Sequence, residues 1–169
     1  IPKKMDKILE QSDKIKSLAE KYKNYSDFLY LGRGINFPVA MEGSLKLKEI
    51  SYIHSEAYPA GEMKHGMNAL LSPELPVLAV MTQNSLYEKT KSSVEEVRAR
   101  KSKIILVASE GDNEAAELAE DVIYVPKTME LLEPLLNTIP LQLFAYHVAV
   151  ALGRDVDRPR NLAKSVTVE

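Results

Sequence analysis

Two stretches of the sequence, PVLAVMT at residues 76–82 and KIILVAS at residues 103–109, are apolar at nearly every consecutive position. A strand that is buried on only one face alternates apolar and polar residues, whereas a continuous apolar run of this length is typical of a strand buried on both faces. Strands of that kind occur in parallel sheets that are covered by helices on both sides. This feature therefore predicts a central parallel sheet between two helical layers.

Segments with helical periodicity separate the expected strands along the chain. The alternation predicts a three-layer α/β/α, doubly wound domain of the flavodoxin-like kind, with a five-stranded parallel sheet. In such sheets ligands gather at the carboxyl ends of the strands. The expected strands are residues 28–31, 53–58, 76–82, 103–109 and 121–125. The expected helices are residues 2–23, a helix with Pro38 in its first turn, a short helix with a turn at 61–71, and residues 85–101, 113–119 and 130–152.

Single residues suggest two local details of the helices. Ser85 is followed three residues later by Glu88, which is the spacing of a capping box, so Ser85 is expected to be the N-cap of its helix. Pro140 lies inside the last helix and is expected to kink or divide it, because proline lacks the amide proton that a helix interior needs.

The composition argues against several classes of function. The 169 residues contain 22 Lys and Arg against 24 Asp and Glu, a net charge of −2, so neither nucleic acid nor an anionic membrane is an expected partner. Cysteine is absent, which excludes thiolate metal sites and cysteine nucleophiles in this chain, and no histidine pair has the spacing of a metal site. We expect no metal and no cofactor. No apolar run reaches the roughly 18 to 20 residues that span a membrane, and the chain begins without a secretion signal, so a cytoplasmic protein is expected.

The helix expected after the glycine turn carries a polar stripe among apolar neighbours. Glu42, Lys46 and Glu49 fall within about 60° of one another on a helical wheel. They can be a set of exposed ion pairs, each worth a few tenths of a kcal/mol. Alternatively, a carboxylate half-buried in such a stripe could have its pKa raised and act as a base next to a carbonyl group. The opposite side, with Lys48, Ser44 and Ser51, is expected to face water.

Other residues are weaker candidates on local pattern alone. His65 lies between glycines in an expected loop, where a histidine is more often a surface or capping residue than a catalyst. His147 is most simply a satisfied core residue, and Lys164 reads as a solvated lysine. The turns at residues 32–34 and 82–85 could each hold a phosphate through backbone N–H groups, but they are equally explained as ordinary strand-to-helix turns.

Two long motifs resemble a known family. LYLGRGINFPVAMEGSLKLKEISYIHSEAYPAGEMKHG at residues 29–66 and DVDRPRNLAKSVTVE at residues 155–169 are similar, in order and separation, to the end of glutamine:fructose-6-phosphate amidotransferases. That family joins an N-terminal glutaminase with a cysteine nucleophile to two sugar-isomerase (SIS) domains. The resemblance covers essentially the whole chain, and implies that residues 1–169 form the second SIS domain with an N-terminal helix at 2–23 and a C-terminal catalytic tail at 155–169.

The resemblance also implies roles for individual residues. Glu49 corresponds to the base that moves a proton between C1 and C2 of the open-chain sugar. Lys46 and Glu42 are its neighbours, with Lys46 near the developing enolate oxygen. His65 corresponds to the residue that opens the sugar ring and reaches into the active site of the adjacent subunit. Lys164 corresponds to the tail lysine that forms a Schiff base with the ketone.

The implied substrate is fructose 6-phosphate, which this family converts with glutamine-derived ammonia to glucosamine 6-phosphate. Ala163 and Lys164 are expected to contact the sugar, and Arg160 is expected to hold the tail or the sugar in place. The loop MTQNSLYEK at residues 81–89 lacks the Ser/Thr-rich composition with which the first SIS domain holds the phosphate, so this chain is expected to be inactive alone. A homodimer with a shared active site, completed by the glutaminase and the first SIS domain, is the expected assembly. The alternatives are a non-catalytic SIS module that senses a sugar phosphate, or another SIS-type sugar-phosphate isomerase or deglycase.

Overall fold

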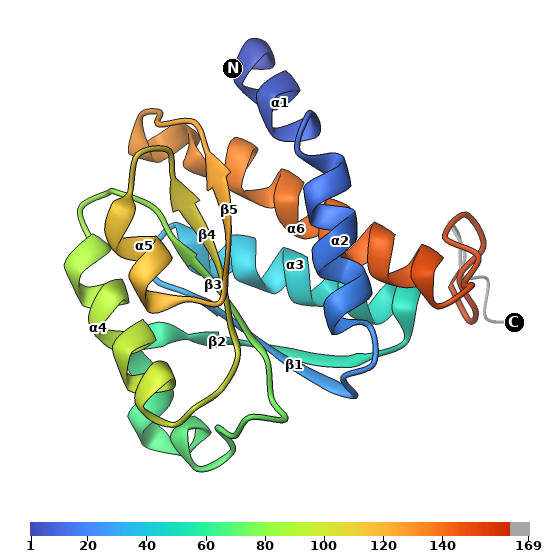
Figure 1. Ribbon diagram of the computed structural model, residues 1–169, viewed down its shortest axis with the longest axis horizontal. Coiled ribbons are helices and arrows are strands. Elements are labelled where there is room, and N and C mark those ends of the chain that lie inside the picture. Colours follow the sequence, from blue (N-terminus) through green and yellow to red (C-terminus); the bar gives the residue numbers. More distant parts are fainter. Residues whose placement is uncertain (163–169) are drawn as a thin grey trace, which may run out of the picture.

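The computed structural model describes residues 1–162 and has a parallel sheet as its middle layer (Figure 1). The strands are β1 (Asp27–Gly32), β2 (His54–Pro59), β3 (Val77–Met81), β4 (Ile104–Ser109) and β5 (Asp121–Val125). They form one five-stranded sheet in the order β2-β1-β3-β4-β5, and every neighbouring pair is parallel. This order is that of flavodoxin-like sheets, which confirms the predicted fold class.

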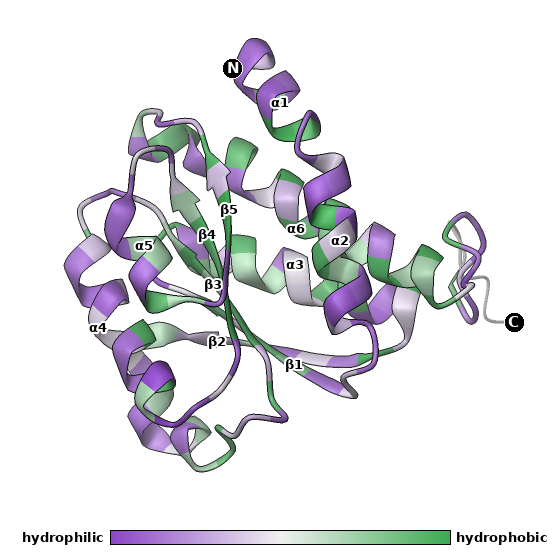
Figure 2. Ribbon diagram, in the orientation of Figure 1, coloured by the Kyte–Doolittle hydropathy of each residue, from purple (hydrophilic) through white to green (hydrophobic). Residues whose placement is uncertain are grey.

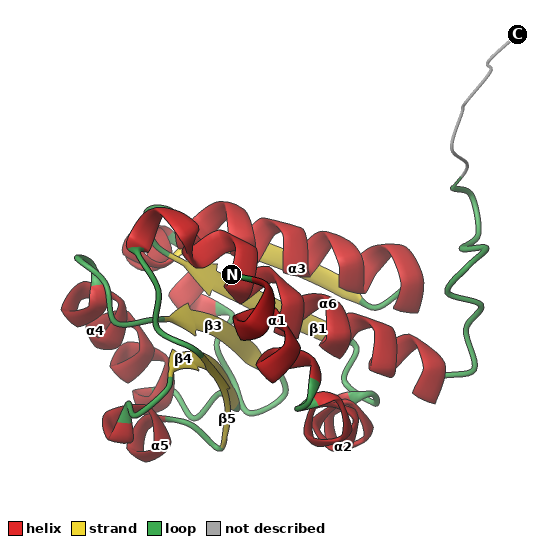
Figure 3. Cartoon of the chain, turned by 90° about the horizontal axis from the view of Figure 1, so that it is seen from above, coloured by secondary structure: helices red, strands yellow, loops and turns green. Residues whose placement is uncertain are grey.

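Helices cover both faces of the sheet (Figure 3). The helices are α1 (Pro2–Leu9), α2 (Ser12–Tyr22), α3 (Asn36–Ser51), α4 (Tyr87–Ala99), α5 (Asn113–Leu118) and α6 (Glu133–Ala151), and the 3₁₀ turns are η1 (Ala60–His65), η2 (Met67–Ala69) and η3 (Glu130–Leu132). Helices α1, α2, α3 and α6 share one hydrophobic cluster, whereas α4, α5 and η1 contribute to the other.

Successive residues of the buried strands pack against opposite helical layers. Leu78 and Ile105 belong to the cluster with α3 and α6, whereas Ala79 and Leu106 belong to the cluster with α4 and α5. All positions of β3 and β4 are buried, and these strands are among the hydrophobic parts of the ribbon (Figure 2). The continuous apolar runs in the sequence are explained by this two-sided burial.

Helix α3 approaches both the sheet and α6 closely at a glycine. A Cβ atom at Gly43 would lie 2.7 Å from Leu141 Cδ1 in α6 and 2.9 Å from the Tyr30 ring in β1. Close packing of this kind fixes how α3 lies in the helical layer. It therefore also fixes the direction in which the polar stripe of α3 faces.

Two helix predictions were wrong in their extent. The helix expected at residues 2–23 is two helices, α1 and α2, and the Gln11 side chain between them donates to the backbone oxygen of Tyr124, 2.8 Å away. The helix expected at residues 61–71 is the pair of 3₁₀ turns η1 and η2. Gly66 separates these turns at φ 135°, a conformation that L side chains rarely adopt.

The two predicted local details also need correction. Ser85 is not an N-cap: α4 has Leu86 at that position, and the Ser85 hydroxyl instead donates to Glu130 Oε1 at 2.8 Å. Pro140 does not divide α6, which runs unbroken from Glu133 to Ala151. Packing of α6 against α2 and α3 holds the helix together through the position where proline removes one hydrogen bond.

Among the described residues, no helix has the length and apolar character to cross a membrane.

Candidate functional site

The polar stripe of α3 is half-exposed and internally paired. Lys46 Nζ lies 2.5 Å from Glu49 Oε2 and 4.0 Å from Glu42 Oε1, so a single ammonium group stands between two carboxylates. The side chains of Glu42, Lys46 and Glu49 are 34%, 32% and 27% exposed. Gln142 from α6 donates to Glu42 Oε1 at 3.1 Å, which fixes the outer carboxylate against the neighbouring helix. The spacing predicted from the sequence is therefore realised.

The charge state of Lys46 follows from these contacts. The hydrogen bond to Glu49, assisted by the negative charges of Glu49 and Glu42, raises the pKa of Lys46 above its ordinary value although partial burial opposes the shift. Lys46 is therefore protonated at neutral pH. A protonated amine cannot attack a carbonyl carbon, but it can stabilise a negative charge that develops on a nearby oxygen.

The other side of α3 differs in part from the prediction, because Lys48 is exposed but the two serines are not. Ser44 and Ser51 do not face water: both are 1% exposed. Ser55 in β2 donates to the backbone oxygen of Ser44 at 2.7 Å, and Ser51 donates to the backbone oxygen of Leu47 at 2.6 Å. The Ser44 hydroxyl lies 3.2 Å from Ser55 Oγ, so both serine hydroxyls of α3 have a hydrogen-bond partner where the helix lies on the sheet.

A groove crosses the carboxyl end of α3. Tyr52 ends the helix in the left-handed conformation, at φ 68°. Its hydroxyl accepts a hydrogen bond from the Arg160 backbone N–H at 2.9 Å, and the Arg160 guanidinium stands over its ring, 4.1 Å from the centroid. The segment at 160–162 thus returns to α3, and a groove of about 510 Å³ opens there. Its lining is Leu45, Lys48, Glu49, Tyr52, Ile53, His54, Arg160, Asn161 and Leu162.

The described structure brings only some of the predicted site residues together. Glu49 and Arg160 line the same groove. His65 lies elsewhere, at the end of η1, where it is 72% exposed and 3.6 Å from Glu62 Oε2. Because α3 ends where β2 begins and η1 follows the other end of β2, the length of that strand separates His65 from Glu49 within one chain (Figure 1). Ala163 and Lys164 lie outside the described residues.

The two turns that were considered as phosphate cradles are better explained as strand-to-helix turns. The backbone N–H groups of Asn36 and Phe37 donate to the carbonyl oxygens of Arg33 and Gly34 rather than pointing at a free space. A Cβ atom at Gly34 would lie 2.5 Å from Leu86 Cδ1, so the leucine of the second turn fills the hollow of the first. A phosphate between these turns would have to displace Leu86.

The sequence analysis missed a buried polar cluster at the carboxyl ends of β1 and β3. The Glu133 carboxylate, 4% exposed, accepts hydrogen bonds from Thr82 Oγ1 at 2.7 Å, Asn84 Nδ2 at 2.8 Å and Asn36 Nδ2 at 3.2 Å. Asn137 in turn donates to Asn36 Oδ1 at 2.9 Å. This cluster ties the two loops to the start of α6. The one signal for it in the sequence is an asparagine inside the apolar stretch of α6.

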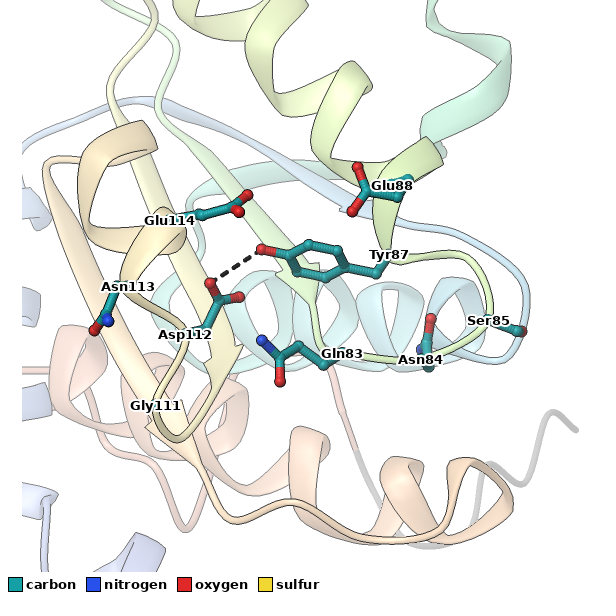
Figure 4. Close-up of a pocket in the computed structure, with 9 residues that line it drawn as sticks. All are labelled: Gln83, Asn84, Ser85, Tyr87, Glu88, Gly111, Asp112, Asn113 and Glu114. Carbon is teal, nitrogen blue, oxygen red and sulfur yellow. Dashed lines mark hydrogen bonds between the residues drawn. The ribbon is translucent and has the colours of Figure 1, made fainter.

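A wider hollow of about 630 Å³ lies between the loops that follow β3 and β4 (Figure 4). Tyr87 donates to Asp112 Oδ1 at 3.0 Å, and the same oxygen accepts the Ala115 N–H at 3.2 Å as the cap of α5. Burial, followed by the bond to Asp112, raises the pKa of Tyr87. With Glu88 and Glu114 also on its rim, this hollow is acidic and would repel an anionic substrate.

The remaining histidines show no sign of metal ligation. His147 Nε2 lies 2.9 Å from Ser12 Oγ, which supports the prediction of a satisfied residue, and partial burial lowers its pKa. His54 Nδ1 lies 3.0 Å from Asp27 Oδ1 at the surface. In the part of the chain that the structure describes, no three His, Cys, Asp or Glu side chains are placed to share a metal ion.

Comparison with protein families identifies the class of domain. The model of the SIS domain matches residues 23–152, which is most of the chain, so the chain belongs to the SIS domain family. Among curated proteins it is 58% identical over all 169 residues to the glutamine–fructose-6-phosphate aminotransferase (isomerizing) of Thermus thermophilus and 59% identical to that of Chlorobaculum tepidum. The chain spans 28% of the length of each of these relatives.

Solved structures give the same class. The C-terminal domain of glucosamine-fructose-6-phosphate aminotransferase from Francisella tularensis superimposes with a TM-score of 0.85 at 41% identity, over 89% of this chain and 43% of that one. A structure titled as a putative tagatose-6-phosphate ketose/aldose isomerase from Clostridium novyi has a TM-score of 0.84 at 17% identity, over 98% of this chain and 46% of that one. The second likeness establishes the fold alone.

Proposed function

We propose that this chain is the second SIS domain, with its C-terminal catalytic tail, of a glutamine–fructose-6-phosphate aminotransferase of the isomerizing kind. In this role it supplies catalytic groups for the conversion of fructose 6-phosphate and ammonia to glucosamine 6-phosphate. Identity of 58–59% to enzymes of that name over the full chain supports the proposal. The observation that carries it is the ammonium group of Lys46, held beside the Glu49 carboxylate at the edge of a groove that the C-terminal segment crosses.

The proposed division of roles follows from the chemistry of each group. Glu49 removes a proton from one carbon of the open-chain sugar and returns it to the next, which turns a ketose into an aldose. Lys46, protonated, stabilises the negative oxygen that develops between these steps. Because Lys46 remains charged, the amine that forms a Schiff base with the ketone has to be another one, and we assign that role to Lys164.

Several groups that the proposed reaction needs do not line the groove on α3 of this chain. His65, which opens the sugar ring, is proposed to act in the active site of a second subunit, because β2 separates it from Glu49 within one chain. A homodimer with shared sites is thus part of the proposal, as is a cytoplasmic location. The phosphate is proposed to be held by the first SIS domain, and ammonia to come from a glutaminase domain with a cysteine, a residue that this chain lacks.

Replacement of Glu49 tests the proposal in the full-length parent enzyme. Glu49→Gln keeps the size of the side chain and removes the base, so turnover should fall about 100-fold to 10,000-fold while fructose 6-phosphate still binds. Formation of glucosamine 6-phosphate and calorimetric binding of the sugar phosphate are the two measurements. Glu95→Gln, on the exposed side of α4, is the matched control and should retain full turnover.

The same pair of measurements separates the proposal from its main alternative. A SIS module that only senses a sugar phosphate needs no base, so its response to the ligand would survive Glu49→Gln. Undiminished turnover in this variant would remove Glu49 from the proposed role. Loss of sugar binding together with turnover would show that the side chain holds the substrate rather than moving its proton.

A further inference from the structure

A small basic hollow lies apart from the groove on α3. It has a volume of about 230 Å³ and is bounded by the turn after β1, by η1 and by α4. Three of the lining side chains are cationic and one is acidic. The lining residues are Arg33, Ala60, Gly61, Lys64, Lys89, Ser92, Ser93 and Glu96.

The guanidinium of Arg33 enters this hollow without a partner. Its Nε atom is buried and has no hydrogen-bond partner, and no ion pair joins Arg33 to another side chain within residues 1–162. A buried donor that is left unpaired costs about 1–3 kcal/mol, and more when the group is charged. The Arg33 side chain could avoid this penalty by turning to solvent. Its position therefore indicates that the donors of the guanidinium form hydrogen bonds with a ligand.

Gly61 makes the space that Arg33 occupies. A Cβ atom at Gly61 would lie 2.7 Å from Arg33 Nη2 and 3.2 Å from Cζ. The φ angle of Gly61 is outside the left-handed region, so the backbone conformation does not itself require glycine there. Glycine at position 61 therefore makes room for the guanidinium of Arg33 and is not required by the backbone conformation of the turn.

The charges around the hollow do not cancel. Lys64 Nζ is 3.2 Å from Glu96 Oε1, so the only carboxylate in the lining is already paired. Arg33 and Lys89 remain without an acidic neighbour in that lining. The hydroxyl of Ser93 donates a hydrogen bond to the backbone oxygen of Ala60, at 3.0 Å. This leaves two positive charges in the lining of a hollow of about 230 Å³.

We propose that this hollow binds a tetrahedral oxyanion, either as inorganic phosphate or as the phosphoryl group of a phosphate monoester. The planar guanidinium of Arg33 presents parallel N–H groups that match two phosphate oxygens, and Lys89 adds a second charge. The exposed hydroxyl of Ser92 is a further donor on the same side of α4. The site does not depend on the proposed reaction, because it is built from η1 and α4 and shares no residue with the groove on α3.

Titration of the 169-residue chain with inorganic phosphate, followed by amide NMR at constant ionic strength, tests the proposal. Saturable shifts are expected at Arg33, Gly61 and Lys89. Arg33→Gln, which removes the charge and the paired donors, should weaken phosphate binding at least tenfold. Arg98→Gln, at an exposed position of the same helix as Lys89, is the matched control and should leave the affinity unchanged.

A second variant and two further ligands make the result decisive. Gly61→Ala keeps every charge but displaces the guanidinium, so it should also weaken phosphate binding. Fructose 6-phosphate should shift the same amides, and a tighter affinity than that of phosphate would identify a monoester as the ligand; equal affinities would identify the free ion. The proposal is overturned if Arg33→Gln binds phosphate as tightly as the original chain, if fructose without phosphate produces the same shifts, or if the shifts do not saturate.

Discussion

Two polar clusters in this domain each contain a glutamate but differ in how deeply that glutamate is buried. In the cluster around Glu133, the buried carboxylate accepts three hydrogen bonds, one from Asn36 at the start of α3 and two from the loop after β3. In the stripe on α3, Glu49 and Lys46 are about one-third exposed, and Glu49 lines a groove. In the first cluster three donors converge on the carboxylate within one chain, while the buried Asn137 Oδ1 has no partner among the described residues. The second retains free hydrogen-bonding capacity toward the groove.

This difference in burial predicts different roles for the two clusters: the one around Glu133 stabilises the fold, and the one on α3 takes part in the proposed chemistry. A buried carboxylate with its donors in place rigidifies the loops that it joins, and removing it leaves several donors unpaired. A half-exposed ion pair contributes little to stability, because water and side-chain entropy offset most of the attraction. We therefore expect mutations at Glu133 to affect folding and mutations at Glu49 to affect chemistry, with little overlap between the two effects.

The largest effect on folding is expected at Glu133. In Glu133→Ala the donors of Thr82, Asn84 and Asn36 lose their shared acceptor, which should lower the free energy of unfolding by about 3 kcal/mol. Urea unfolding of the 169-residue chain measures this change. A loss of less than 1 kcal/mol would mean that water replaces the carboxylate and that the cluster is not a structural tie.

The control for this experiment is Glu130→Ala. Glu130 accepts from Ser85 at the surface, so the same change in residue type breaks an exposed contact rather than a buried one. Its effect on the free energy of unfolding should stay below about 1 kcal/mol. Comparable losses in the two variants would remove the distinction between the buried and the exposed cluster.

The proposed role of His65 in the site of a second subunit leads to a second prediction. If His65 acts in the site of a second subunit, mixing the inactive parents His65→Ala and Glu49→Gln creates a heterodimer with one intact site. Random exchange makes half of the molecules heterodimers, so about one quarter of the original turnover should return, by this counting of symmetric sites. Product formation before and after subunit exchange measures the recovery.

The control for subunit exchange is the double variant, which carries both substitutions on the same chain. Mixing it with either single variant should restore no turnover, because no site then receives an intact Glu49 and an intact His65. The shared site would be contradicted if freshly exchanged dimers of the two single variants stayed inactive. Activity in each single variant before mixing would also contradict it.

Much of the fold could be predicted because the decisive signals are local. Strands β3 and β4 are buried on both faces, and this burial is visible as unbroken apolar runs. The errors arose where a distant residue decides the local structure. The Ser85 hydroxyl bonds to Glu130, 45 residues away, instead of capping α4. Likewise, Gln11 between α1 and α2 bonds to Tyr124, 113 residues away.

The candidate site also combines contacts that follow from local spacing with contacts between residues distant in the sequence. The contact of Lys46 with Glu49 follows from i,i+3 spacing on one helix and was predictable from the residues alone. The presence of Arg160 in the same groove was expected only from the family resemblance, since no local pattern joins residues 108 positions apart, as Arg160 and Tyr52 are. The Glu133 cluster was missed because its donors are up to 97 residues away in the sequence.

The smallest expected effect concerns the stability that the Lys46–Glu49 pair contributes and its dependence on pH. The pKa of Lys46 is raised above its ordinary value of 10.5, first by the hydrogen bond to Glu49 and then by the nearby negative charges. A group whose pKa is raised by folding stabilises the folded state below its unfolded pKa, and this contribution disappears as pH rises through the folded pKa. Because Lys46 is about one-third exposed, the contribution should remain below about 1 kcal/mol.

Comparison of the original chain with Lys46→Met by urea unfolding at several pH values isolates this contribution. The difference in the free energy of unfolding should be constant between about pH 7 and 10 and should shrink above that range, because an uncharged amine no longer attracts the two carboxylates. Added salt should reduce the same difference at neutral pH, since the pair is partly exposed to water. A difference that did not shrink above pH 10, or that salt left unchanged, would show that the charge of Lys46 does not stabilise α3 through the two carboxylates.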